Sequence, residues 1–112
     1  MKVIIAGSRD ITDYNLVNQT VKESGFIITE VVSGGARGVD KLGEKYAIEN
    51  NLILTIFNPN WSKEGLSAGF NRNKKMAEYA DALIAIWNGS SGTANMIEEA
   101  KKKNLQIFIK RV

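Results

Sequence analysis

Four clusters of small, hydroxylic and charged residues in this chain come directly after short apolar runs. They occupy residues 7–10, 33–40, 58–61 and 88–93. Glycines bring backbone N–H groups close to a ligand, hydroxyls donate hydrogen bonds, and a guanidinium can fork onto a phosphate or carboxylate. In an open parallel sheet all strands end at one edge, so loops that are far apart in sequence converge there. The pattern therefore predicts an anion-binding site at that edge.

Residues 33–40 run from a predicted buried strand into a predicted helix. The loop contains three glycines, which are Gly34, Gly35 and Gly38. They permit a tight turn with bare N–H groups, and Arg37 is able to contact a phosphate. Asp40, in the first helical turn, is placed to accept hydrogen bonds from ribose hydroxyls. A plain glycine turn with Asp40 as a helix-start residue is the alternative. The loop matches neither G-x-G-x-x-G nor a Walker loop.

A second loop of the same kind precedes the last predicted helix. Its five consecutive small or hydroxylic residues are Gly89, Ser90, Ser91, Gly92 and Thr93. The helix that follows places Met96, Ile97 and Ala100 on its inward face. A capped helix start would need only one serine, so the run favours anion binding.

Other candidate ligands come from the first strand and the third helix. Gly7, Ser8 and Arg9 follow the first strand, where the central crevice of such sheets opens. Arg72 and Asn73 open the predicted third helix. Arg9 as a plain surface cation is the alternative for the first group.

Residues 58–70 contain Pro59 and two glycines and show little periodicity. A loop of this length in so small a protein is usually functional or mobile, and we expect it to form a lid. Trp61 and Phe70 lie on it. These rings either stack on a base or pin the loop to the body, and the sequence does not choose between the two.

Apolar strand patterns alternate with helical patterns along the chain, which predicts an α/β fold with a mostly parallel five-stranded sheet. The expected strands cover residues 2–6, 28–33, 53–57, 82–87 and 105–110. The expected helices cover residues 13–24, 38–51, 72–80 and 91–103. Gly25 is expected to end the first helix as a left-handed cap.

The second helix is expected to pack Val39, Leu42 and Tyr46 on a common face and to leave Glu44 to water. Gly43 inside it costs roughly 1 kcal/mol of helix propensity. That cost suggests a close approach to the sheet or to a ligand, with a merely tolerated glycine as the alternative.

Composition narrows the possible chemistry. The chain has 112 residues, which suits a single domain, and contains neither cysteine nor histidine. Disulfides, ordinary zinc sites and Ser-His or Cys-His nucleophiles are therefore excluded, and we expect no metal and no cofactor. Any acid–base chemistry must use Asp, Glu, Lys, Tyr or water.

Charge and hydropathy bear on partners and location. The apolar runs are too short to cross a bilayer, so we expect a cytoplasmic protein with no membrane contact. A net charge of +3 is compatible with nucleic acid but only weakly supports it. Lys101, Lys102 and Lys103 are expected to form a solvated helix end, where cations complement the helix dipole.

An ordered set of motifs resembles the YspA/YpsA-related branch of the SLOG superfamily. The motifs are Gly7-Ser8-Arg9, Ser33-Gly34-Gly35-Ala36-Arg37-Gly38-Val39-Asp40, Trp61-x-x-x-Gly65-x-x-Ala68-Gly69-x-x-Arg72-Asn73-x-x-Met76, and Trp87-x-Gly89 with Ser91-Gly92-Thr93. The resemblance implies a Rossmann-like three-layer sandwich whose strand-end loops bind nucleotides or their derivatives. It also implies a homo-oligomer and a sensor or sponge of a nucleotide signal, such as an ADP-ribose-like or cyclic nucleotide, in phage or bacterial conflict.

Two related branches suggest other functions. The LOG phosphoribohydrolases place paired glutamates two and three residues after the threonine, where this chain has Asn95 and Met96. Hydrolysis of a nucleoside phosphate or ADP-ribose would then need Glu98 or Asp40 to activate water. The DNA-processing protein A family shares the loop at residues 33–40 but adds basic surface, so binding of single-stranded nucleic acid is the less favoured alternative.

Overall fold

The computed structural model describes residues 1–112, and its centre is a five-stranded sheet in the order β3-β2-β1-β4-β5. The strands are β1 (Lys2–Gly7), β2 (Glu30–Ser33), β3 (Ile53–Ile56), β4 (Ala82–Trp87) and β5 (Gln106–Arg111). Every neighbouring pair is parallel. All five predicted strands are present, and the predicted Rossmann-like α/β fold is confirmed.

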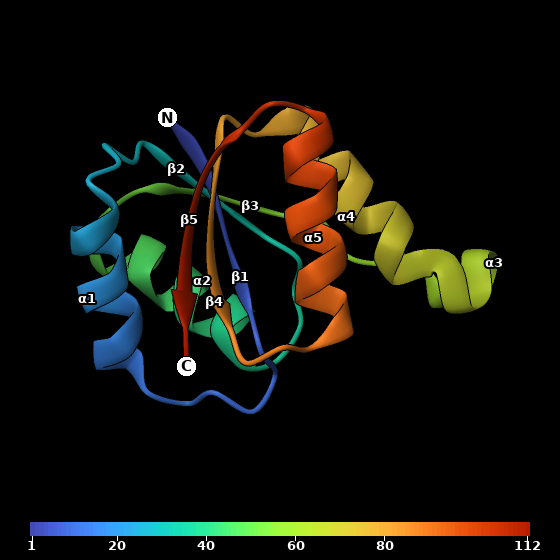
Figure 1. Cartoon of the computed structure of the whole chain (residues 1–112), viewed down its shortest axis with the longest axis horizontal. Coiled ribbons are helices and arrows are strands. Elements are labelled where there is room, and N and C mark those ends of the chain that lie inside the picture. The colour runs from blue at the N-terminus through green and yellow to red at the C-terminus, as the bar shows by residue number, and fades with distance from the viewer.

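Helices cover both faces of this sheet (Figure 1). They are α1 (Tyr14–Ser24), α2 (Val39–Glu49), α3 (Trp61–Glu64), α4 (Ala68–Tyr79) and α5 (Ser91–Lys102), with a 3-10 turn η1 (Gly65–Ser67) between α3 and α4. One core cluster joins α1 and α2 to the sheet, and the other joins α4 and α5 to its opposite face. The arrangement has three layers. No helix combines the length and apolar character that crossing a bilayer requires.

Side-chain alternation along β1 builds the two cores. Val3 and Ile5 pack toward α1 and α2, whereas Ile4 and Ala6 pack toward α4 and α5. Because β1 and its neighbour β4 are buried on both faces, their sequences are continuous apolar runs, as is usual for central parallel strands. The polar residues that follow such strands are consequently held at a rigid edge.

Glycine and aspartate fix the ends of α1. Asp13 accepts hydrogen bonds from the backbone N–H groups of Asn15 and Leu16 at 3.0 and 3.4 Å, and so caps the first turn. Gly25 follows the helix with φ 71°, the left-handed conformation expected for it.

Helix α2 lies very close to β1. A Cβ added at Gly43 would come within 2.9 Å of the Ile5 Cβ, so the glycine permits this approach to the sheet. Glu44 was expected to face water, and this prediction is wrong. Its carboxylate is buried and accepts a hydrogen bond from the buried Ser33 hydroxyl at 2.7 Å, because α2 turns this position toward the end of β2.

The segment at residues 58–70, expected to be an irregular lid, is mostly helical. It forms α3, η1 and the first turn of α4, which begins at Ala68 rather than at residue 72. Asn60 starts α3 by accepting a hydrogen bond from the Lys63 backbone N–H at 3.2 Å. Figure 1 shows this arm projecting from the body of the molecule. A four-residue helix is too short to leave a hydrophobic period in the sequence.

Candidate functional site

The strand-end loops converge on a cavity of about 600 Å³ at the C-terminal edge of the sheet. It lies between the ends of β1 and β4, the loop after β2, and the first turns of α4 and α5. Twelve of the residues predicted from sequence line it: Gly7, Ser8, Arg9, Arg37, Asp40, Trp61, Arg72, Asn73, Ser90, Ser91, Gly92 and Thr93. The structure thus brings together residues from four separate segments of the chain.

A second cavity of about 540 Å³ adjoins the first. Gly34 and Gly35 line this one, together with Asn58 and Pro59. Five residues line both cavities, namely Arg9, Ala36, Arg37, Trp61 and Arg72. The site therefore has two compartments with a common wall.

Three predicted site residues line neither cavity. Gly38 precedes α2 with φ 80°, and a Cβ there would lie 2.4 Å from the Ser8 carbonyl oxygen, so this glycine packs two loops together. Gly89 has φ 98° and faces open space. The side chain of Glu98 is largely exposed, and its carboxylate lies 4.0 Å from the Lys101 ammonium group. Glu98 is therefore not placed to act on a ligand in either cavity.

Asp40 is a buried carboxylate that holds the loop after β2. Its Oδ2 accepts a hydrogen bond from the Ala36 backbone N–H at 3.2 Å. Burial raises the pKa of Asp40 to about 6, opposed by that hydrogen bond and by the positive charge of Arg72. The Gly35 N–H in turn donates to the Ser33 hydroxyl at 3.1 Å. At Gly35 and Ala36 the expectation of bare N–H groups is wrong, because the protein itself uses both donors.

Arg72 extends from α4 across the loop after β2. Its guanidinium donates to the Gly34 carbonyl oxygen through Nη1 and to the Asn73 side-chain oxygen through Nε, the latter at 2.9 Å. Burial lowers the pKa of Arg72, and the nearby Asp40 carboxylate partly opposes that effect. These two hydrogen bonds hold the guanidinium in one orientation at the wall between the cavities.

Three guanidinium groups at this wall make no salt bridge. Arg9, Arg37 and Arg72 are absent from every salt bridge in the protein. Arg9 is also close enough to Arg72 for its charge to lower the pKa of Arg72. Three positive charges gathered at one wall, with Asp40 the nearby carboxylate, favour an anionic ligand there.

The N-terminus of α5 supplies a second set of donors to the first cavity. Ser90 precedes the helix, and its hydroxyl donates to the Thr93 hydroxyl at 3.2 Å rather than capping the backbone. The N–H groups of Ser91, Gly92 and Thr93 have no partner within the protein, and the first turn carries no acidic residue. Such a terminus attracts negative charge.

Asn73 connects α4 to this donor set. Its buried amide nitrogen donates to the Gly92 carbonyl oxygen at 3.2 Å and to the Asn95 side-chain oxygen at 2.9 Å. Asn73 was a predicted ligand contact, but its amide N–H groups are committed to α5. It orients the N-terminus of that helix.

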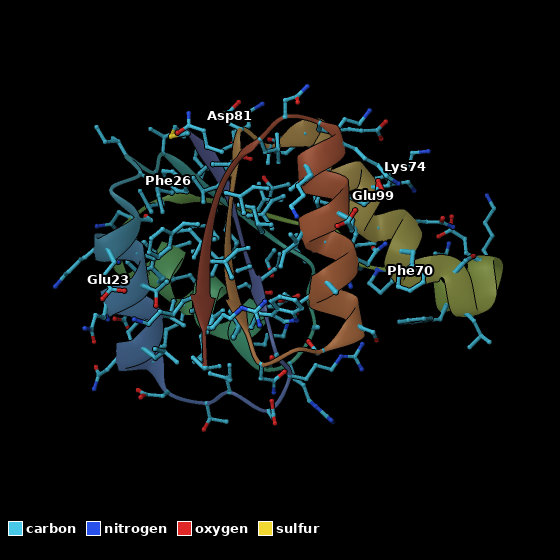
Figure 2. The ribbon with its side chains drawn as sticks, viewed as in Figure 1. Glu23, Phe26, Phe70, Lys74, Asp81 and Glu99 are labelled. Atoms are coloured by element: carbon cyan, nitrogen blue, oxygen red, sulfur yellow. The ribbon has the colours of Figure 1, made fainter.

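The first cavity also has an apolar side, of which sequence reasoning identified only Phe70 as a possible ligand contact. Met76 and Met96 are almost fully buried beneath it, and their inward helical spacing identifies them only as core residues. Leu66 and Phe70 line it from the projecting arm and remain exposed, with Phe70 labelled in Figure 2 near the start of α4. No periodic pattern in the sequence distinguishes these four as cavity residues.

Two polar residues of the first cavity were also overlooked as ligands. The Asn88 amide donates to the Asp10 carboxylate at 3.3 Å, which joins the loops after β4 and β1. Asp10 and Asp40 are the two carboxylates of this cavity, and the second cavity has none.

Comparison with solved structures finds the same fold. DNA processing protein A (DprA) from Streptococcus pneumoniae superposes with a TM-score of 0.78 at 18% sequence identity. The match covers 96% of this chain and 49% of the DprA chain, so the chain spans about half the length of that protein. At this identity the likeness establishes the fold alone.

Comparison of sequences identifies a relative and a family. The Gene 61 protein of Mycobacterium phage D29 is 29% identical over 120 residues, covering 96% of this chain and 94% of the phage protein. The YspA, cpYpsA-related SLOG family matches residues 1–63, which is more than half of the chain and includes the loops after β1 and β2. The chain belongs to the YspA, cpYpsA-related SLOG family.

Proposed function

We propose that this protein binds a phosphate-bearing nucleotide or nucleotide derivative at the C-terminal edge of its sheet and releases it unchanged. The observation that carries the proposal is that three arginines outside any salt bridge line the same cavity as the N-terminus of α5, which has no side-chain cap. Both features attract anions. Binding without turnover suits a sensor or a sponge for a nucleotide signal, either ADP-ribose-like or cyclic.

Each part of such a ligand has a matching surface. Phosphate oxygens would accept hydrogen bonds from the backbone of Ser91, Gly92 and Thr93 and from the arginines. A base would lie against Trp61 and the apolar side of the first cavity, where aromatic stacking contributes about 1–3 kcal/mol per base. A ribose hydroxyl would donate to Asp40 Oδ1, since Oδ2 accepts from the Ala36 N–H.

Hydrolysis of a nucleoside phosphate or ADP-ribose is the second candidate. The observation in its favour is that Asp40 lines the cavity with a pKa raised to about 6, a value suited to a general base near neutral pH. The hydrogen bond from Ala36 argues against that role, because it stabilises the charged carboxylate, lowers the pKa of Asp40 and so weakens it as a base.

Single-stranded nucleic acid remains a weaker alternative partner. The name of DNA processing protein A says that this structural neighbour acts on DNA. In this chain, Trp61 and Phe70 are the exposed aromatic rings at the cavities, and successive stacking platforms are absent.

We also propose, from the family resemblance, that the protein forms a homo-oligomer.

Turnover is tested by incubating the purified protein with AMP, ADP-ribose and a cyclic nucleotide, and by separating the products chromatographically. We expect each nucleotide to be recovered intact at background rates. Asp40→Asn tests the buried carboxylate, and Glu98→Gln is the control for the exposed one. Release of base or ribose phosphate in proportion to protein, abolished in Asp40→Asn, would instead make the protein a hydrolase.

A further inference from the structure

The two edges of the sheet differ in charge. β5 forms one edge and β3 forms the other. β5 ends in Lys110 and Arg111, and the Lys110 ammonium group lies 3.1 Å from the Glu23 carboxylate of α1. Charges of this kind keep an edge strand from pairing with another chain. β3 has the sequence ILTI and carries no charge, so this edge lacks that protection.

We propose that β3 is a pairing edge and that its partner is a second copy of this chain, joined through a two-fold axis into one continuous sheet. A two-fold axis brings the same surface of both copies together, so the two β3 strands run antiparallel. The inference rests on the homo-oligomer proposed above and assigns its surface. It does not depend on the ligand.

The backbone of β3 offers the hydrogen bonds that such a pair needs. The Phe57 N–H donates to the Ser33 carbonyl oxygen at 2.8 Å, so the backbone of this position points toward β2. Because backbone groups alternate along a strand, those of Leu54 and Ile56 point away from β2. In an antiparallel pair centred on Thr55, Leu54 of one copy lies opposite Ile56 of the other and exchanges both N–H···O bonds with it. The two-fold axis repeats this exchange and so satisfies the outward groups of both residues in both copies.

The side chains along this edge are apolar and exposed. Ile53 and Ile56 are 63% and 41% exposed, and Ile48 of α2 is 69% exposed. Ile48 follows Glu44 by one helical turn, and Glu44 accepts a hydrogen bond at the end of β2, so this side of α2 faces the outer strands. An apolar, uncharged edge strand is a template for pairing with another chain, and a second copy covers it.

Charge selects β3 rather than β5 for pairing between copies. Through a two-fold axis a surface meets itself, so an edge with charges of one sign repels its copy. β5 carries two positive charges and no negative one. Beside β3, Lys41 of α2 already forms a salt bridge with Glu44 at 3.4 Å. β3 is therefore the edge at which two copies meet without like charges.

Size-exclusion chromatography with light scattering tests the proposal. We expect wild-type protein to have twice the 12.4 kDa mass of the chain. Ile53→Lys and Ile56→Lys each replace an exposed apolar side chain of the edge by a charge that the two-fold axis repeats, so both variants should have the mass of one chain. Circular dichroism checks that each variant is folded.

Ile109→Lys is the matched control. Ile109 is 39% exposed on β5, the opposite edge strand, so the same substitution there should preserve the double mass. Amide hydrogen exchange supplies a second readout. The Leu54 and Ile56 N–H groups should be protected in wild type and exchange faster in Ile53→Lys, whereas the Phe57 N–H, bonded to Ser33, should stay protected in both.

The outcomes separate this inference from the proposals on which it builds. A wild-type mass equal to that of one chain would overturn both the inference and the homo-oligomer. A double mass retained by both β3 variants, or lost equally in Ile109→Lys, would overturn the assignment to β3 and leave the homo-oligomer standing. Failure of AMP to bind would overturn the nucleotide-binding function and leave this inference intact.

Discussion

The position of Asp40 could be predicted from the sequence, but its contacts could not. The glycine-rich loop and the helix that follows it predict Asp40 at the edge of the sheet, and the structure places it in the first cavity. Its hydrogen bond from Ala36 and its burial depend on how α2 and α4 pack around the loop. Arg72, which donates to the Gly34 carbonyl oxygen, is 38 residues further along the chain than Gly34, so local sequence does not reveal this arrangement.

The raised pKa of Asp40 makes stability depend on pH. The pKa of Asp40 is about 6 in the folded state, against an ordinary value of 3.8, so the folded state binds the proton more tightly than the unfolded state does. This group therefore lowers the free energy of unfolding progressively as pH rises from about 4 to about 6. A shift of about 2 pKa units corresponds to roughly 3 kcal/mol.

Asp40→Asn removes this titration and retains an oxygen that can accept from Ala36. Relative to wild type, the variant should gain about 3 kcal/mol of unfolding free energy between pH 4 and pH 7. Urea unfolding of both proteins across that range measures the difference, in which other titrating groups cancel. A difference that stays constant with pH would show that the Asp40 carboxylate is not held in an unfavourable environment.

At the scale of elements, the central strands were predicted correctly from the sequence, whereas the helical structure of the arm was not. β1 and β4 are buried on both faces, so they read as continuous apolar runs bounded by polar loops. The arm of α3 and η1 contains no buried residue, so its sequence carries no hydrophobic period. Its helical turns instead depend on local hydrogen bonds such as the one from the Lys63 N–H to Asn60. A capping residue predicts a helix only weakly in a segment that also contains glycine and proline.

The contact between α2 and β1 is tested by Gly43→Ala. The added methyl group would lie 2.9 Å from the Ile5 Cβ, so the helix must move away from the sheet. Overpacking costs about 1–3 kcal/mol and alanine returns about 1 kcal/mol of helix propensity, so we expect a net loss of up to about 2 kcal/mol.

Gly92→Ala is the control for helix propensity, since an added Cβ at this helical position meets nothing within 4 Å. Thermal and urea unfolding should show Gly92→Ala at least as stable as wild type. If Gly43→Ala were equally stable, Gly43 would be a merely tolerated glycine.

At the scale of the whole molecule, the fold followed from the sequence and the ligand did not. Alternating elements, a parallel sheet and the position of the loops could all be predicted from period and composition. A net charge of +3 does not show how the charges are arranged. Lysines on the surface pair with glutamates, whereas three arginines at the cavities make no salt bridge. Most of the lysine pairs have the i,i+3 or i,i+4 spacing of one helix and can be read from the sequence, whereas the gathering of three arginines from separate segments depends on tertiary packing.

Titration calorimetry of AMP and adenosine against wild type, Arg37→Ala and Lys22→Ala tests most directly whether this cavity binds a nucleotide through its phosphate. Lys22→Ala removes one exposed positive charge from α1, away from both cavities. We expect AMP to bind wild type more tightly than adenosine, and Arg37→Ala to weaken AMP by about 1.5–3 kcal/mol without lowering the melting temperature appreciably. Lys22→Ala should leave AMP binding unchanged. Equal affinity for AMP and adenosine, or unchanged AMP binding in an Arg37→Ala protein that melts at a much lower temperature, would contradict the account.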